Sequence, residues 1–489
     1  MPEKKSESVV VVSTAAELSK LIPGAATPDA KHEDRAVTTE HVLELDGVRL
    51  EYTATAGTFR VKLDEKPPVD LFYVAYVAKG ADRTRPVTFA FNGGPGSASV
   101  WLHMGFLGPK RVVGDVGSMP AYPAIAEPNP HTLLTTSDVV FIDPTSTGFS
   151  RPAEGKGSEY HGVKADIESV GEFIRRWVSE HGRWASPKYL AGESYGTTRA
   201  AGLAEHLQEK GMSFNGLVLV SLALKFDTLL FQEGNWLPYV MLLPTAAAIA
   251  HYHEQIVADS VWTLYEEAER FAIDTYAPAL MRGDRLSASE RDAIAEGVAR
   301  FLGLSKEYVL RSDLKVDLRR FCRELLREER ATVGRLDGRF RGREKDAAGE
   351  GLENDPSLSA LMGAYTSALH DHLHHELGYT DHEHRYEILN RDVWPWRFDD
   401  CENAYLDLTK ALREALNHNP SLRVFAASGL YDLATPWSAA EYTLAQLQVE
   451  PERRAAITSR CYPAGHMMYI HEESARALRA DLEAFYRGR

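Results

Sequence analysis

The sequence LAGESYGTTRA, residues 190–200, places Ser194 between Gly192 and Gly196. A short apolar strand is predicted before the serine and a helix after it, so Ser194 lies on a tight strand-to-helix turn of the kind called a nucleophile elbow. Glycines on both sides let backbone segments approach more closely than a β-carbon permits, and the turn holds the hydroxyl where a base can reach it. Taken alone, the same residues could be a glycine-rich start of a helix, because a Gly-x-Ser-x-Gly string also arises by chance.

A serine nucleophile needs a base that takes its proton and an acid that orients the base. Two later loops supply both in the order Ser, Asp, His of an α/β-hydrolase. Asp432 follows one predicted strand in VFAASGLYDLATPW, and His466 follows another in RCYPAGHMMY. His471 is a rival base, but it lies at the start of the last predicted helix. Alone, Asp432 could be a turn residue and His466 a packed histidine; with the elbow and in this order they predict a catalytic triad with Ser194.

The segment FAFNGGPGSAS, residues 89–99, follows another predicted strand and contains paired glycines. Backbone N–H groups of glycine can face a cavity without obstruction by side chains, as an oxyanion hole requires. We assign the two donors to Gly94 and to Tyr195, the residue after the nucleophile. A phosphate-binding loop would need GxxxxGK[ST], which this segment lacks, and a purely structural turn is the other alternative. Such acyl transfer needs no cofactor.

The elements that must position these residues alternate along the chain. Helices predicted at 160–181 and 197–209 alternate with strands, which is typical of a mostly parallel α/β sheet. A last helix is predicted at 471–486, and Asp46-Gly47 is a good hairpin turn. Strand-like runs are found at residues 41–45, 48–53, 71–77, 86–91, 139–142, 188–191, 216–222, 421–427 and 456–462.

Between about residues 228 and 400 the pattern changes to helices with few strands, and the sheet then resumes. Ser287 followed by Glu290 forms a capping box in this region. A helical block inserted in this way predicts an α/β-hydrolase fold, a mostly parallel central sheet flanked by helices, with a helical cap over the active site. The predicted regions are a flexible N-terminal arm at 1–35, the first part of the core at 36–227, the cap insertion at 228–400 and the second part of the core at 401–489.

The chain of 489 residues has a formal net charge of −15 and a pI near 5.7. No Lys/Arg-rich stripe offsets this charge, so phosphates would be repelled and nucleic acid is not an expected partner. The longest apolar run, residues 239–250, contains Pro244 and falls short of the roughly 18 residues needed to span a bilayer. We therefore expect a peptide or a small acyl substrate and no membrane partner, and a homodimer stays open.

Features of sequence near the N-terminus and at the cysteines bear on the compartment. The apolar stretch at residues 9–12 is shorter than the roughly 7 to 15 residues of a signal peptide, so we expect a cytoplasmic location. Cys322, Cys401 and Cys461 lie far apart without CxxC spacing. Neither a zinc site nor a disulfide framework is predicted from them.

Two further clusters are interpreted as structural. Six histidines lie between residues 370 and 384, and His370 with His374 is an i, i+4 pair able to share a metal. The stretch lacks HExxH, so we interpret it as a solvated helix followed by a polar loop, without a metal. The segment Arg335–Arg343 mixes arginine with aspartate and glycine, and we expect an exposed loop of the cap.

Taken together, these motifs resemble the serine carboxypeptidase family of α/β-hydrolases, and within it a bacterial-type member. The resemblance covers about residues 90 to 470, and the motifs occur in the family's order. They are Asn92-Gly93-Gly94-Pro95-Gly96, Asp143 with Thr147-Gly148-Phe149-Ser150, Gly192-Glu193-Ser194-Tyr195-Gly196, Asp432 with Pro436, and Gly465-His466-Met467.

The resemblance implies the triad, the oxyanion hole and the helical insertion named above. It also implies removal of C-terminal residues from peptides. The substrate's free carboxylate would be gripped by Asn92 and Glu193, with Gly93 and Phe106 completing the substrate-binding set.

Three positions depart from the family's pattern. Phe106 stands where the family typically has a second glutamate, before Leu107-Gly108-Pro109, so one of the two carboxyls that share a proton around the substrate's C-terminus is missing. Ala90 replaces the usual tryptophan and Ser97 the usual cysteine. The serine fits a protein without disulfides, whereas the other two changes put carboxylate recognition in question.

A hypothesis follows for Glu193. Beside the apolar Phe106 it should be desolvated without a partner, which raises its pKa. Neutral Glu193 can donate a hydrogen bond to a carboxylate and ionised Glu193 repels it, so activity on free C-termini should fall as pH rises through that pKa. Lys110 or Arg111 could instead reach the carboxylate. An esterase or acyltransferase with the same triad, and a non-catalytic binding protein with the same fold, stay as alternatives.

Overall fold

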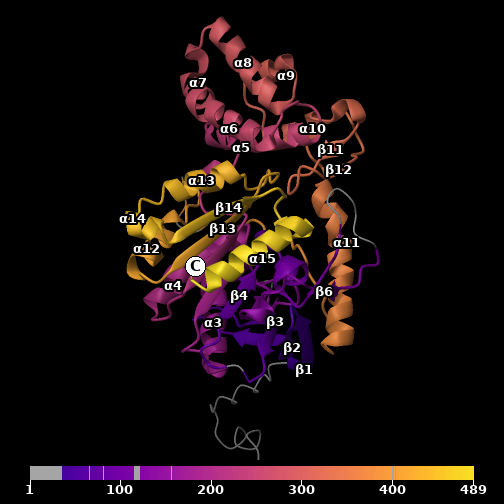
Figure 1. The fold of residues 1–489 in the computed structure, drawn as a ribbon, viewed down its shortest axis with the longest axis vertical. Helices are drawn as coiled ribbons and strands as arrows, with labels where there is room; N and C mark the ends of the chain where they lie inside the picture. Colours follow the sequence, from indigo (N-terminus) through magenta and orange to yellow (C-terminus); the bar gives the residue numbers. More distant parts are fainter. Residues whose placement is uncertain are drawn as a thin grey trace, which may run out of the picture. The chain divides into compact units, whose positions relative to one another are not determined.

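A ten-stranded sheet is the centre of the part of the chain that this computed structural model describes, residues 36–488 without 65, 81, 115–121, 156, 399, 400, 402 and 403 (Figure 1). The predicted arm, residues 1–35, lies outside the described residues. The strands are β1 (Ala36–Leu45), β2 (Val48–Val61), β3 (Val69–Ala78), β4 (Val87–Phe91), β7 (Asp138–Ile142), β8 (Arg151–Pro152), β9 (Lys188–Glu193), β10 (Gly216–Val220), β13 (Arg423–Gly429) and β14 (Ile457–Tyr462).

The strand order is β1-β2-β3-β7-β4-β9-β10-β13-β14, and the short β8 pairs with β3. Neighbours from β7 to β14 are parallel, whereas β1, β2 and β3 pair antiparallel and β3 meets β7 antiparallel. The mostly parallel sheet and the α/β-hydrolase fold class are thereby confirmed. The hairpin turn at Asp46-Gly47 is confirmed by the pairing of Leu45 with Val48. Strand β2 continues eight residues beyond its predicted end at 53, because β3 pairs with residues 52–61.

Helices cover both faces of the sheet. On one face lie α3 (Val163–Glu180), α4 (Tyr195–Glu209) and α12 (Thr409–His418), whose apolar side chains join one buried core with the sheet. The fully buried Trp177 of α3, for example, meets Phe89 of β4 edge-on with ring centroids 5.5 Å apart. On the other face α15 (Glu472–Tyr486) and α11 (Pro356–Asp371) join a second core.

A third hydrophobic core lies among helices of the predicted insertion, which Figure 1 shows grouped at the top of the view. The capping box at Ser287 and Glu290 is confirmed at the start of α8. The apolar run at 239–250 forms most of α5 and is buried among its neighbours, and none of the helices in the described ranges is long and apolar enough to cross a membrane. The helices of the predicted insertion are α5 (Leu237–Tyr252), α6 (Val261–Phe271), α7 (Ala277–Arg282), α8 (Ala288–Leu302), α9 (Lys306–Arg311) and α10 (Leu318–Glu324).

Asp138, at the start of β7, is a buried charge on which two arginines converge. Its Oδ1 accepts hydrogen bonds from Arg85 Nε at 2.8 Å and Ala78 N at 2.9 Å, and Oδ2 accepts one from Arg183 at 2.5 Å. The carboxylate is fully buried and the Arg183 side chain is nearly so. Such a pair leaves an uncompensated charge when one partner is removed.

We therefore expect Asp138→Ala to lower the free energy of unfolding by about 3–5 kcal/mol, measured by urea denaturation. Glu44→Ala is a matched control, because its ion pair with Arg49 is largely exposed and should contribute at most about 1 kcal/mol. Equal effects of the two substitutions would contradict this account of Asp138.

Candidate active site

Ser194 joins β9 to α4 in a backbone conformation that few side chains adopt, with φ 60° and ψ −129°. Its N–H donates to the carbonyl of Val220 in β10 at 2.9 Å. Its carbonyl accepts from the N–H and the hydroxyl of Thr197, at 2.8 and 2.7 Å. These bonds hold a residue whose conformation costs of order 1–3 kcal/mol, a strain typical of functional sites.

The glycines around the serine are required by the space available. A β-carbon on Gly192 would lie 2.1 Å from the carbonyl oxygen of Gly196, and one on Gly196 would lie 2.8 Å from that of Phe91. A β-carbon on Gly93 would lie 2.4 Å from the backbone nitrogen of Tyr195. Alanine would therefore not fit where the end of β9, the start of α4 and the 92–96 loop meet. This close approach is the reason that the sequence analysis gave for the glycines.

The two predicted oxyanion donors line the same cavity as Ser194. Gly94 has φ 101°, and its N–H donates to no acceptor among the described residues. Tyr195 is the first residue of α4, so its N–H points out of the helix N-terminus. The structure therefore brings both predicted donors to the nucleophile.

Asp432 and His466 are in direct contact. His466 Nδ1 lies 2.7 Å from Asp432 Oδ2, an oxygen that also accepts from the hydroxyl of Thr435 at 2.6 Å. Asp432 Oδ1 accepts from the N–H groups of Ala434 and Thr435. Burial disfavours the charged imidazolium, but Asp432 and Glu193 together outweigh burial, and the pKa of His466 lies above its ordinary value. With Nδ1–H held by the carboxylate, Nε2 is the nitrogen able to act as base.

The hydroxyl of Ser194 makes no hydrogen bond to His466 within the part of the chain described. Their backbones are nevertheless tied to one strand end, because Ser194 N–H donates to Val220 and the hydroxyl of Ser221 donates to the carbonyl of His466 at 2.7 Å.

Residues 334–339 of the insertion lie between the two catalytic loops, a position that the sequence did not predict. The carbonyl of Leu336 accepts from His466 N–H at 2.7 Å, and that of Arg335 accepts from Leu433 N–H at 3.1 Å. Gly338 N–H donates to the carbonyl of Tyr431 at 2.9 Å. The insertion thus holds the loops of both Asp432 and His466 in place.

The expectation that Arg335–Arg343 is an exposed loop is therefore wrong for residues 337–340, which are buried. Asp337 and Arg339 form a bidentate ion pair with each other, at 2.9 and 2.6 Å, so the burial of their charges is compensated. Gly465 packs so closely on Asp337 that a β-carbon would lie 2.4 Å from its Cβ. The sequence does contain a signal for this burial, because Asp337 and Arg339 carry opposite charges two residues apart and can therefore neutralise each other.

Glu193 has two partners, so the prediction that it lacks one is wrong. The amide of Asn92 donates to Oε1 and the hydroxyl of Tyr469 donates to Oε2, each at 2.8 Å. Burial nevertheless raises the pKa of Glu193 to about 7, the direction that the sequence predicted. Phe106 stacks on the ring of Tyr469, with centroids 5.8 Å apart, and the tyrosine hydroxyl reaches the glutamate. Tyr469, three residues after His466, was missed because nothing local in the sequence links it to Glu193.

The alternative cations Lys110 and Arg111 are engaged elsewhere. Lys110 pairs with Glu376 at 3.1 Å, and Arg111 pairs with Glu472 at 2.8 Å. Asn92 also accepts from Leu102 N–H through its side-chain oxygen. Neither Asn92 nor its partner Glu193 lines the cavity that holds the nucleophile.

The cavity at Ser194 has a volume of about 770 Å³. Its walls come from the oxyanion loop, the segment 226–231, the start of α10, Arg335 and the loop after Asp432, and most of them are apolar. The lining residues are Gly94, Pro95, Ser194, Tyr195, Ala223, Phe226, Leu229, Leu230, Phe231, Asp317, Leu318, Arg319, Arg335, Trp394, Phe398, Ala434 and Thr435.

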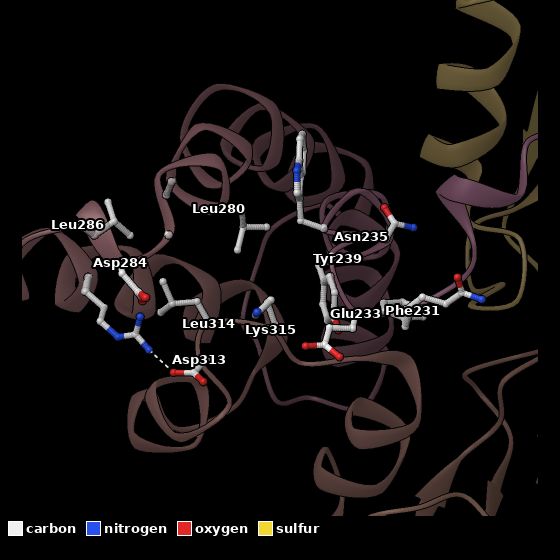
Figure 2. A pocket seen from close by; sticks show the side chains of 16 residues that line it. Phe231, Glu233, Asn235, Tyr239, Leu280, Asp284, Leu286, Asp313, Leu314 and Lys315 are labelled. Atoms are coloured by element: carbon white, nitrogen blue, oxygen red, sulfur yellow. Dashed lines mark hydrogen bonds and ion pairs between the residues drawn. The ribbon is translucent and has the colours of Figure 1, made fainter. Parts of the chain in front are cut away.

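A second cavity of about 520 Å³ lies within the helical insertion, and Figure 2 shows Phe231, Tyr239 and Lys315 on its wall. Phe231 lines both cavities. No member of the predicted triad lines the second cavity, whereas Ser194 lines the first, so the cavity at Ser194 is the candidate active site.

The histidine-rich stretch is only partly solvated. His372 is buried and meets the hydroxyl of Tyr76 at 2.8 Å, and the same hydroxyl meets His103 at 2.7 Å. The interpretation as a solvated helix is therefore wrong for His372, which packs in the core. Within the described ranges, no group of three or more His, Cys, Asp and Glu side chains could hold a metal ion, and Cys322, Cys401 and Cys461 form no disulfide.

Comparison with known families gives one match over most of the chain. A profile described as Peptidase_S10, serine carboxypeptidase, matches residues 51–468. This range contains the elbow, both catalytic loops and the whole insertion.

Relatives match over shorter segments. Serine carboxypeptidase S10 family member 1 of Dictyostelium discoideum is 25% identical over 172 residues, 35% of this chain and 38% of the relative. The pheromone-processing carboxypeptidase kex1 of Schizosaccharomyces japonicus is 27% identical over 157 residues, 32% of this chain and 28% of the relative. The chain thus spans less than two fifths of the length of the curated relatives that it matches.

Among solved structures, the prohormone-processing carboxypeptidase Kex1ΔP from Saccharomyces cerevisiae shares the fold. The superposition has a TM-score of 0.56 and 13% sequence identity, and it covers 89% of this chain and 92% of that chain.

The close approach at the elbow predicts the effect of one added methyl group. Gly192→Ala should displace Ser194 and lower the rate of hydrolysis of a chromogenic ester by about 100-fold or more, because misplacing a reacting group by about 1 Å costs that much. Gly351→Ala is the matched control, since a β-carbon there meets nothing within 4 Å. Full activity of the Gly192 variant would contradict the steric account.

The raised pKa of Glu193 predicts how stability depends on pH. The folded state holds this proton more tightly than the unfolded chain, where the ordinary pKa is 4.5. The resulting stabilisation is complete below pH 4.5, is lost as pH rises through about 7, and amounts to about 3 kcal/mol.

Glu193→Gln cannot titrate, so the free energy of unfolding of the wild type should fall relative to this variant as pH rises across that window. Urea denaturation of both proteins between about pH 4.5 and pH 8 measures the difference. A difference that stays constant with pH would show that Glu193 does not titrate there.

Proposed function

The chain belongs to the serine carboxypeptidase family, and from that premise we propose that it is a serine-type carboxypeptidase that hydrolyses C-terminal peptide bonds through an acyl-serine intermediate. The observation that carries the proposal is the 2.7 Å contact between His466 and Asp432 beside the cavity that contains Ser194. The reaction needs no cofactor, because the chain's own side chains and N–H groups supply every step.

In the first half of the reaction the oxygen of Ser194 attacks the carbonyl carbon of the scissile bond. His466 Nε2 takes the serine proton, and Asp432 stabilises the imidazolium that results. The negative charge that develops on the carbonyl oxygen is met by the N–H groups of Gly94 and Tyr195. The carbon–nitrogen bond then breaks, and the imidazolium gives its proton to the leaving amine.

In the second half a water molecule gives its proton to His466 and attacks the acyl-serine carbonyl. The same oxyanion donors meet the second tetrahedral intermediate. The bond from Ser194 to the acyl carbon breaks, the serine oxygen recovers its proton from the imidazolium, and the shortened peptide leaves with a new carboxylate.

The apolar wall of the cavity supports a preference for apolar or aromatic substrate side chains. Four aromatic side chains line it: Phe226, Phe231, Trp394 and Phe398. Binding is favoured when an apolar substrate group leaves water and packs against such side chains.

Other statements about the protein stay proposals. A bacterial-type member of the family has no support from the relatives named above, which are eukaryotic. A cytoplasmic location rests on the short apolar stretch at 9–12. A homodimer stays open, and the expected partner is a peptide or a small acyl substrate.

The test is cleavage of a library of N-blocked peptides, each made with a free and an amidated C-terminus and followed by mass spectrometry. We expect one residue to be lost at a time from the free C-terminus, and none in the Ser194→Ala variant. Cleavage at internal bonds would contradict a carboxypeptidase, and hydrolysis of simple esters without peptides would favour the esterase alternative.

A further inference from the structure

Arg335 is a cation at the reaction cavity that the mechanism above does not use. It lines the same cavity as Ser194, and its side chain is 41% exposed. The charged side chains along the described part of this cavity are Asp317, Arg319 and Arg335, so cations outnumber the carboxylate.

Asp317 is already engaged in the helix that follows it. Its Oδ1 accepts from the N–H groups of Arg319 and Arg320 at 2.8 and 3.0 Å, which caps α10. Because this carboxylate is committed to the helix, the positive charge of Arg335 is not neutralised from that side of the cavity.

Asp355, the carboxylate next to Arg335, is occupied as well. It accepts from the backbone N–H groups of Arg335 and Leu336 and from the N–H and hydroxyl of Ser357. The guanidinium Nε lies 3.7 Å from Asp355 Oδ2, which is longer than a hydrogen bond. Among the described residues no acceptor hydrogen-bonds to this guanidinium, so its donors can serve a ligand.

The backbone contacts place Arg335 on the histidine side of the nucleophile. Its carbonyl accepts from Leu433, next to Asp432, and the carbonyl of the following residue accepts from His466. Burial and the charge of Arg335 both oppose protonation of His466, whereas Asp432 and Glu193 favour it, and the pKa is raised. The charge of Arg335 therefore acts on the imidazole.

This side of the cavity receives the leaving residue, because His466 protonates the leaving amine. When the C-terminal residue leaves, its carboxylate is bonded to the same Cα as that amine. An anchor for the carboxylate must therefore lie within one residue of the imidazole. Glu193, one of the expected anchors, also acts on His466, but both of its carboxyl oxygens already accept hydrogen bonds, one from Asn92 and one from Tyr469.

We propose that Arg335, a residue of the helical insertion, binds the C-terminal carboxylate of the substrate and determines its specificity for free C-termini. The inference rests on the carboxypeptidase function proposed above. A guanidinium presents a planar fork of N–H donors that matches a carboxylate in a bidentate contact, which Lys cannot reproduce.

The experiment compares kcat and KM for peptides of one sequence with a free-acid or an amidated C-terminus. Arg335→Met should lower kcat/KM for the free acid by about 10- to 100-fold, mainly through KM, because a charge-assisted contact is lost. The amide should change by less than about 3-fold, and Arg335→Lys should retain part of the free-acid preference.

Arg319→Met is the matched control, since Arg319 is a cation of the same cavity and its N–H bonds to Asp317; in the described part of the chain its backbone has no hydrogen bond to the loops of Asp432 or His466. It should leave the free-acid preference within about 3-fold of the wild type. A chromogenic ester, which has no carboxylate, reports whether the Arg335→Met site is intact; the backbone bonds of Arg335 do not depend on its side chain.

Equal losses on acid, amide and ester in Arg335→Met would overturn the proposal, as would an unchanged free-acid preference or its loss in Arg319→Met. If the wild type cleaves free-acid peptides and Arg335→Met retains the preference, this inference alone fails. If the wild type releases no C-terminal residue from any peptide, both the proposed function and this inference are wrong.

Discussion

The site depends on a steric constraint at residues 192–196, where three backbone segments meet without room for a β-carbon. At this turn Ser194 has a positive φ, which is the conformation of a nucleophile elbow. The same close approach places the oxyanion loop beside the first N–H group of α4. Nucleophile and oxyanion donors are thus set by one packing arrangement, which the parallel pairing of β9 with β4 and β10 supports.

The helical insertion contacts the loops of Asp432 and His466 and forms part of the wall of the cavity at Ser194. Its residues 334–339 accept a hydrogen bond from the backbone of His466 and contact the loop of Asp432 on both sides. The base and its orienting acid come from separate strands of the sheet, so their contact depends on how these two loops are held together. Because Asp337 and Arg339 neutralise each other, the segment can be buried there without an unpaired charge. Arg335, two residues before Asp337, lines the cavity at Ser194 and lies 3.7 Å from the carboxylate of Asp355.

The sequence was informative wherever the cause of a structure is local. Glycine sterics predicted the elbow, alternation of strands and helices predicted the sheet, and the Asp46-Gly47 turn predicted the hairpin. Chain order and motif context brought Asp432 and His466 together, because loops at the carboxyl ends of parallel strands meet at one edge. The contact of Tyr469 with Glu193 spans 276 residues, and no local pattern encodes it. The burial of 337–340 was missed for the same reason, since charged residues are normally exposed and only their distant surroundings explain the exception.

The central claim is that Ser194 is a nucleophile activated by His466 and oriented, through that histidine, by Asp432. The most direct measurement is the mass of the intact protein after reaction with a serine-directed fluorophosphonate, followed by mapping of the modified peptide. The account predicts one adduct per chain, on the peptide that contains Ser194, formed far more slowly in His466→Ala. No adduct, an adduct on another residue, or a labelling rate indifferent to His466 would contradict it.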